Sequence, residues 1–302
     1  MQMNPRGARL STVLGGALVA ALLASCGGVD PIEAPAGRSG SADFSRLAFI
    51  GDSFTAGFQS GGLMESRQKA SFAYRFALQP GQAPTRFEIP AAAAPGVPRL
   101  LERQSFSPLT IAAPNDPGAP GNYQARFTNL ALPRPYNNLA VPGATTAMAL
   151  TTNTTGDPRQ SLFYLYAPAI LRTQNIPLAM VDQAATLDPT FVVVELGIND
   201  VLQGVINGQP DRMTPLESFE ASYDEVLSRV SVAGTDARRP GVVLVNVPAP
   251  TAYPYMTTVP WFIVNPTTRE PVLNPVTGQV IPLIGVVGGQ PRPLPPGSLV
   301  TI

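Results

Sequence analysis

Three short motifs carry groups that could perform acyl transfer. The stretch "LAFIGDSFTAG" leads from an apolar run into Ser53, "NNLAVPGATT" turns at Gly143, and "ELGIND" contains Asn199. A serine hydroxyl can attack a carbonyl carbon, and backbone N–H groups or a side-chain amide can stabilise the oxyanion that forms. Each motif alone is weak evidence, because a serine or asparagine after a strand more often caps a helix.

The elements that must position these motifs are short apolar runs. Val192–Val194 and Val242–Val245 are continuous rather than alternating, which predicts strands buried on both faces of a parallel sheet. Helices are expected within 66–79 and 162–171, and between the two valine runs. Helical segments between buried strands predict an α/β fold with right-handed crossovers.

The clearest helix is expected in "TPLESFEASYDEVLSRV". Thr214 can cap its start, Pro215 fits the first turn, and Glu217 completes a capping box. Its apolar residues recur at helical spacing and predict one buried stripe.

Taken together, the three motifs resemble the SGNH (GDSL) family of esterases and lipases. "GDSFTAG" resembles the first block of that family, "NLAVPGA" the second and "GIND" the third, over about residues 47–248. The resemblance implies a flavodoxin-like three-layer α/β/α sandwich with a mostly parallel sheet. It also implies that Ser53 is the nucleophile, and that its N–H, the N–H of Gly143 and the side chain of Asn199 form the oxyanion hole. The motif residues expected to support this site are Gly51, Asp52, Gly197 and Asp200.

The base that should take the serine proton is missing. The last block of the family is Asp-x-x-His near the C-terminus, and the 302 residues contain no histidine. Asp52, Glu195 and Asp200 are near the motifs in sequence, but a carboxylate of ordinary pKa, about 4, is a weak base for an alcohol at neutral pH. We therefore expect an ester hydrolase that is inactive or impaired, truncated near Ile302 before a last helix and the Asp-x-x-His block. The alternatives are a non-catalytic envelope lipoprotein that binds a lipid or glycan in the same crevice, and a fragment without a stable fold.

Several other side chains need an interpretation. Glu195 lies in a valine run, where a buried acid costs free energy unless it is paired, so we expect it to reach solvent or a loop donor at the strand end. Tyr253, Tyr255 and Trp261 could line an acyl or aryl pocket, although such residues more often pack a long loop.

The N-terminal residues predict export. Two arginines precede a charge-free apolar run from about Leu10 to Leu23, and small residues lead to Cys26. The quartet "LASC" resembles the bacterial lipoprotein signal, which implies a signal peptide over 1–25 and a lipid on Cys26. A flexible tether over 26–42 would then join a membrane of the bacterial cell envelope to a hydrolase domain over 43–302. An ordinary secretory signal is the alternative.

Composition limits the partners. Lys and Arg number 20, as do Asp and Glu, so the net charge gives no reason to expect a nucleic acid. The single cysteine excludes an intramolecular disulfide. Prolines concentrate in 79–135 and 248–296 and predict long loops there. The expected substrate is a small-molecule ester, a lipid or an acylated glycan, with no metal and no organic cofactor.

Overall fold

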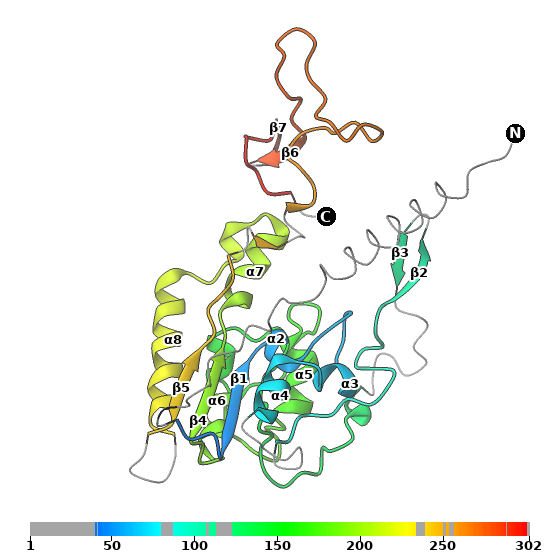
Figure 1. Cartoon of the computed structure of the whole chain (residues 1–302). Coiled ribbons are helices and arrows are strands. Elements are labelled where there is room, and N and C mark those ends of the chain that lie inside the picture. Colours follow the sequence, from blue (N-terminus) through cyan, green and yellow to red (C-terminus); the bar gives the residue numbers. More distant parts are fainter. Residues whose placement is uncertain are drawn as a thin grey trace, which may run out of the picture. The chain divides into compact units, whose positions relative to one another are not determined.

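Figure 1 shows the chain as a computed structural model. The residues that the structure describes are 40, 42–79, 87–106, 109–112, 123–233, 239–249, 252–253, 257–287 and 289–300. The expected signal peptide, Cys26 and nearly all of the tether lie outside the described residues. Within these ranges, no helix has both the length and the apolar character needed to cross a membrane.

A parallel sheet forms the centre of the compact unit that begins at Asp43. Its strands are β1 (Leu47–Gly51), β4 (Phe191–Glu195) and β5 (Gly241–Leu244), in the order β1-β4-β5. Every residue of β1 and β4 is buried, and the continuous valine run of β4 predicted this for residues 192–194. The α/β fold class predicted from the sequence is confirmed.

The segment "NLAV" runs beside β1 and makes a single bridge with it, between Phe49 and Asn138. The N–H of Phe49 donates to the carbonyl of Asn137 at 2.8 Å, and the N–H of Val141 donates to the carbonyl of Gly51 at 3.0 Å. The side chain of Asn138 bonds the carbonyl of Thr55 at 2.8 Å. Backbone bonds to β1 and the Asn138 amide together hold the second motif beside β1 and α2.

β5 departs from the prediction that it is buried on both faces. Val242, Val243 and Leu244 are 37%, 42% and 48% exposed, and β5 is the edge strand that pairs with β4. A continuous apolar run identifies a strand correctly, but its burial depends on what packs over it. In the part of the chain that the structure describes, β5 is covered less than β1 and β4.

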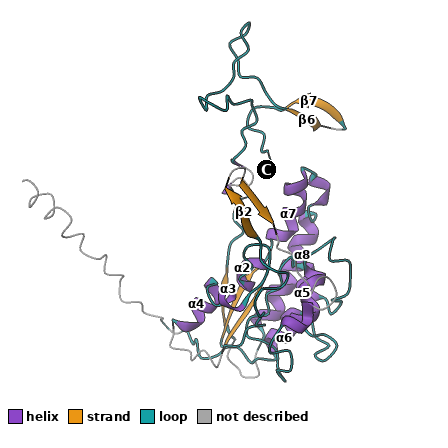
Figure 2. Cartoon of the chain, turned by 90° about the vertical axis from the view of Figure 1, so that its right-hand side faces the viewer, coloured by secondary structure: helices purple, strands orange, loops and turns teal. Residues whose placement is uncertain are grey.

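Helices lie on both faces of the sheet, so the three layers implied by the family resemblance are present (Figures 1 and 2). On one face, Phe76 of α4 (Phe72–Leu78) stacks on Phe191 with ring centroids 6.1 Å apart. On the other face, side chains of α5 (Phe163–Ile170), α6 (Met180–Ala185) and α8 (Leu216–Ser231) join the main apolar core.

Two helix starts differ from the prediction. Residues 66–79 form two helices, α3 (Glu65–Gln68) and α4, because the hydroxyl of Ser71 accepts from the N–H of Tyr74 at 3.3 Å and starts a new helix. The capping box predicted for α8 does not form. Pro215 occupies the cap position without a side-chain bond, and the N–H of Thr214 donates to the carbonyl of Asp200 at 2.7 Å. The buried stripe of α8 is present at Val226 and Val230.

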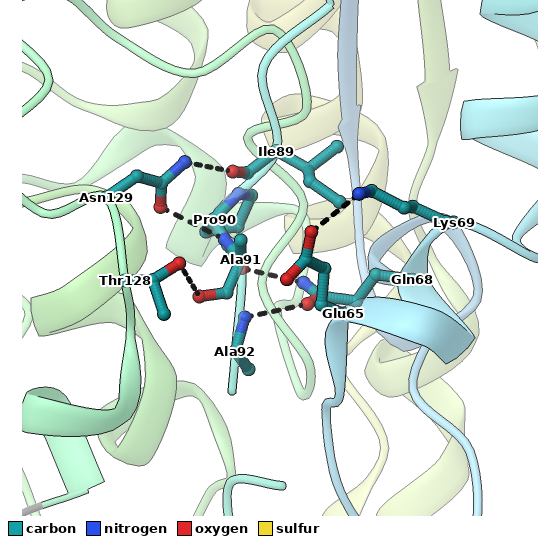
Figure 3. Close-up of polar contacts among 9 residues, drawn as sticks. All are labelled: Glu65, Gln68, Lys69, Ile89, Pro90, Ala91, Ala92, Thr128 and Asn129. Carbon is teal, nitrogen blue, oxygen red and sulfur yellow. Dashed lines mark hydrogen bonds and ion pairs between the residues drawn. The ribbon is translucent and has the colours of Figure 1, made fainter. Parts of the chain in front are cut away.

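The first proline-rich segment contains the hairpin of β2 (Glu102–Phe106) and β3 (Leu109–Ala112) and is anchored by two side-chain amides. Figure 3 shows the side-chain amides of Gln68 and Asn129, each of which donates to one backbone carbonyl and accepts from one backbone N–H, as a paired strand does. The amide of Gln68 donates to the carbonyl of Pro90 at 2.8 Å and accepts from the N–H of Ala92 at 3.0 Å. Asn129 donates to the carbonyl of Ile89 at 2.7 Å and accepts from the N–H of Ala91 at 3.1 Å. The bonds of Gln68 fix residues 90–92 against α3, and those of Asn129 join two parts of the segment to each other.

The second proline-rich segment holds two turns of the same design. Asn265 accepts from the N–H of Thr267 at 2.9 Å, and Asn274 accepts from the N–H of Val276 at 2.9 Å. The hairpin of β6 (Ile284–Val287) and β7 (Gln290–Pro293) follows. The repeated Asn-Pro turns give this excursion its own hydrogen-bonded structure, which proline content alone did not predict.

Candidate active site

Ser53 is the first residue of α2 (Ser53–Ala56), which starts directly after β1. Asp52 caps this helix, because its Oδ1 accepts from the N–H of Phe54 at 3.0 Å. The same oxygen accepts from the hydroxyl of Ser53 at 3.4 Å. Ser53 is half-buried, whereas Asp52 is completely buried. The serine therefore lies at the carboxyl ends of the parallel strands, where open α/β sheets bind ligands.

Gly51 lets two polar side chains approach each other at the end of β1. The register of the sheet pairs Gly51 with Glu195, and a Cβ at Gly51 would lie 2.6 Å from the hydroxyl of Thr55. That hydroxyl donates to Oε2 of Glu195 at 3.0 Å, and the N–H of Asp52 approaches the same oxygen at 3.4 Å. Glu195 is 7% exposed, so of the two expected partners, solvent and a donor at the strand end, it meets donors, which lie at the start of α2.

Asn199 joins the three motifs. It lies in the first turn of α7 (Ile198–Asn207), which begins after Gly197 at a φ of 119°. Its side-chain amide donates to Oδ2 of Asp52 at 3.0 Å and to the carbonyl of Ala144 at 3.0 Å. A primary amide has two N–H donors, and both are used here.

Asp200 links the second and third motifs without facing Ser53. Its carboxylate accepts from the N–H and from the hydroxyl of Thr146, both at 2.9 Å. Gly143 adopts a φ of 84°, and a Cβ there would lie 2.7 Å from the backbone nitrogen of Phe163. Within the described residues, the N–H groups of Gly143 and Ser53 donate to no other group. Two unused donors are thus placed in the motifs that the sequence singled out.

The buried acids next to Ser53 have unusual proton affinities. Burial, followed by the neighbouring charge of Glu195, raises the pKa of Asp52 to about 9. Burial also raises the pKa of Glu195 above its ordinary value. In the described part of the chain, the hydrogen-bond donors on this pair are neutral groups: the side chains of Ser53, Thr55 and Asn199 and backbone N–H groups. Neutral donors compensate two buried carboxylate charges poorly, so the site favours a protonated acid.

A cavity of about 350 Å³ opens beside Ser53. Its lining is mainly apolar and consists of Ser53, Phe54, Ile198, Leu202, Val205, Ile206 and Tyr253. The hydroxyl of Tyr253 is buried and has no hydrogen-bond partner among the described residues. Tyr255 lies outside the described residues, and Trp261 packs edge-on against Phe262 with ring centroids 5.3 Å apart. No three His, Cys, Asp or Glu side chains in the described ranges are grouped to hold a metal ion.

Residues 47–271 match the family model described as GDSL-like Lipase/Acylhydrolase. The chain belongs to the GDSL-like lipase/acylhydrolase family. The match includes all three motifs and the whole parallel sheet. This GDSL-like chain is therefore a hydrolase of the lipase/acylhydrolase type, which acts on esters. Comparisons with curated proteins and with solved structures gave no match.

The structure of this GDSL-like hydrolase brings Asp52, Ser53 and Asn199 together, and it holds Gly143 nearby through Ala144. Gly51 and Gly197 permit the two strand-end turns. Sequence reasoning missed the apolar face of α7, although its helical spacing was readable from the sequence. It also missed the contact between Asp52 and Glu195, which depends on the register of β1 against β4.

Proposed function

We propose that the chain hydrolyses carboxylic esters with Ser53 as the nucleophile. The observation that carries this proposal is the position of Ser53, on the wall of an apolar cavity and within the polar cluster that joins the three motifs. Its hydroxyl would attack the ester carbonyl carbon, and the N–H groups of Ser53 and Gly143 would donate to the developing oxyanion. These donors support the role because neither is used elsewhere in the described residues.

Asn199 would contribute a third oxyanion donor. In the resting structure its amide bonds Asp52 and the carbonyl of Ala144. The proposal therefore requires Asn199 to exchange one of these acceptors for the substrate oxygen. That exchange leaves a buried acceptor without its donor, which costs about 1–3 kcal/mol, so we expect Asn199 to act less effectively than a preorganised donor.

The cavity favours an ester with an apolar acyl group. Ile198, Leu202, Val205 and Ile206 form one face of α7, and the span from the first to the last is about 12 Å along the helix axis. Burying a methylene group contributes about 0.8 kcal/mol, or roughly a fourfold gain. Phe54, which is 53% exposed, extends this apolar surface beside the serine. The expected preference is for acyl chains long enough to cover this face.

Turnover should be slow, because the chain contains no histidine to take the serine proton. When a triad member is removed from a serine hydrolase, the oxyanion hole and substrate binding still leave catalysis about 10³–10⁴-fold above water. We propose that this chain works in that range at neutral pH.

The test is hydrolysis of p-nitrophenyl esters from acetate to decanoate by the full chain and by Ser53→Ala. We expect the wild-type rate to rise about fourfold per added methylene until the cavity is filled, and Ser53→Ala to fall to background. Ser228→Ala, an exposed serine on α8, is the matched control and should keep the wild-type rate. A Ser53→Ala variant that folds and retains the rate would refute the nucleophile assignment.

A second function, binding of a lipid or glycan without catalysis, is favoured by the lack of histidine and by the two bonds of the Asn199 amide. A fluorescent fatty acid should then bind the wild type and Ser53→Ala equally, while wild-type ester turnover stays at background. The two functions separate because catalysis requires the hydroxyl of Ser53 and binding does not.

For either function we infer that the chain is an exported lipoprotein of the bacterial cell envelope. The support is the sequence itself: the arginines, the apolar run and the small residues before Cys26. A lipid on Cys26 would keep the cavity close to a membrane, where acylated substrates collect.

A further inference from the structure

Asp52 and Glu195 form a buried carboxyl pair next to Ser53. They are 0% and 7% exposed, and the register that pairs Gly51 with Glu195 sets Oε2 of Glu195 3.4 Å from the backbone nitrogen of Asp52. Glu195 accepts from Thr55 through Oε2, and Asp52 accepts from Asn199 through Oδ2 and from Ser53 through Oδ1. The pair is therefore connected directly to the hydroxyl that the proposed function makes the nucleophile.

The groups around the pair favour one shared proton. Its donors are neutral, and the titratable groups nearby are Tyr253 after β5 and Tyr223 on α8. Burial raises the pKa of both phenols, and the carboxyl charges add to the effect, so both phenols stay neutral when the pair carries charge. Asp200 on α7 is bonded to Thr146 instead. Like-charged carboxyl groups this close cannot both ionise at neutral pH, so one proton stays between them.

We propose that Asp52 and Glu195 share one proton in the resting protein, and that Asp52, after this proton has left, accepts the hydroxyl proton of Ser53. This inference rests on the proposed function, because it supplies the base that the absent histidine would have provided. It differs from the interpretation of Asp52 as a helix cap alone, which needs no proton exchange.

Each step of the proposed reaction balances. The Oγ–H bond of Ser53 breaks, its proton moves to Oδ1 of Asp52, and Oγ bonds to the carbonyl carbon while the carbonyl π electrons move to the oxygen. When the tetrahedral intermediate collapses, the proton passes from Asp52 to the departing alkoxide, which leaves as an alcohol. Water then releases the acyl group in the same way, with Asp52 again accepting and returning the proton.

The proposal predicts an alkaline activity profile. Because Asp52 must lose the shared proton first, the rate of serine attack should rise about tenfold per pH unit below the midpoint and level off above it. The raised pKa of Asp52, about 9, gives the expected midpoint. Removing the charge of Glu195 should lower that midpoint by about one pH unit or more, since a like charge nearby disfavours ionisation.

The test is the rate of covalent labelling by a fluorophosphonate between pH 6 and 10.5, with Ser53→Ala as the background. Glu195→Gln keeps the shape of the side chain and removes its charge. We expect this variant to label about tenfold faster than wild type at pH 7, a gain that loss of a merely structural residue would not produce. Glu217→Gln, an exposed acid on α8, is the matched control and should keep the wild-type midpoint. Tyr253→Phe should also keep the wild-type midpoint, which would show that the titrating group is the carboxyl pair and not the nearby phenol.

The outcomes separate the two proposals. If no variant and no pH gives labelling at Ser53, the proposed function fails and this inference fails with it. If Ser53 labels but Glu195→Gln leaves the midpoint unchanged, the proposed function stands and the carboxyl pair is not the base. Infrared difference spectra of the wild type between pH 7 and pH 10.5 provide a readout that does not depend on folding of a variant. If a protonated carboxyl band disappears near the labelling midpoint, the shared proton is supported. If no such band disappears, the shared proton is overturned.

Discussion

Raising the pH from 6 to 8 should destabilise the folded protein through the Asp52–Glu195 pair. Burial and the charge of Glu195 raise the pKa of Asp52 from 3.8 to about 9. The folded chain therefore holds a proton across a range in which the unfolded chain has released it. The resulting stabilisation is complete below about pH 4, the ordinary Asp range, and is lost as the pH rises through the folded value.

The size of this loss of stability follows from the one extra proton that the folded chain holds. Each pH unit costs about 1.4 kcal/mol per proton held by the folded state alone, so two units cost about 2.7 kcal/mol. Asp52 is completely buried and Glu195 nearly so, and solvent should therefore screen little of this effect. No histidine contributes to the pH dependence of stability between pH 6 and 8, because the chain contains none. Against a typical stability of about 5–15 kcal/mol, this change is large.

Urea unfolding of the wild type and of Glu195→Gln at pH 6, 7 and 8 measures this effect. The free energy of unfolding of the wild type should fall by about 2–3 kcal/mol across the series. In Glu195→Gln, whose Asp52 midpoint is expected about one pH unit lower, the fall should be nearly as large up to pH 7 and smaller only between pH 7 and 8. A flat wild-type series would refute the shared proton. The result does not depend on catalysis, so it tests the pair even if Ser53 proves unreactive.

Two further predictions concern other parts of the chain. Gln68→Ala removes the amide that bonds Pro90 and Ala92, so it should lower the free energy of unfolding by about 2–4 kcal/mol. The control Gln59→Ala, at an exposed position, should lower it by less than about 0.5 kcal/mol. Equal losses in the two urea titrations would contradict the anchoring role of Gln68. Cells fed labelled palmitate should incorporate the label into the wild type and lose it in Cys26→Ser; label that persists in the variant would show that Cys26 is not the lipidated residue.

The sequence predicted those features that local residue patterns determine. Buried apolar runs identified β1 and β4, and the motif after β1 located Ser53 at the carboxyl edge of the sheet. The apolar stripe of α8 predicted burial of Val226 and Val230 correctly. A helix stripe is readable because its apolar residues recur at a fixed spacing, and a strand buried on both faces is readable because its apolar run is short and continuous.

Features that depend on the packing of distant segments were missed. The exposure of β5 depends on what covers it, and its valine run does not carry that information. Thr214 had the chemistry of a cap, but its N–H bonds Asp200 and Pro215 takes the cap position. The contact between Asp52 and Glu195 requires the register of β1 against β4, which separates these residues widely in sequence and joins them in space.

Peptide mass spectrometry after labelling of the full chain with a fluorophosphonate at pH 10 would locate the nucleophile. We expect a single adduct on the hydroxyl of Ser53, blocked by a competing long-chain ester that fills the adjoining cavity. An adduct on another residue, or none on a protein that unfolds cooperatively, would contradict the assignment of Ser53 as the nucleophile.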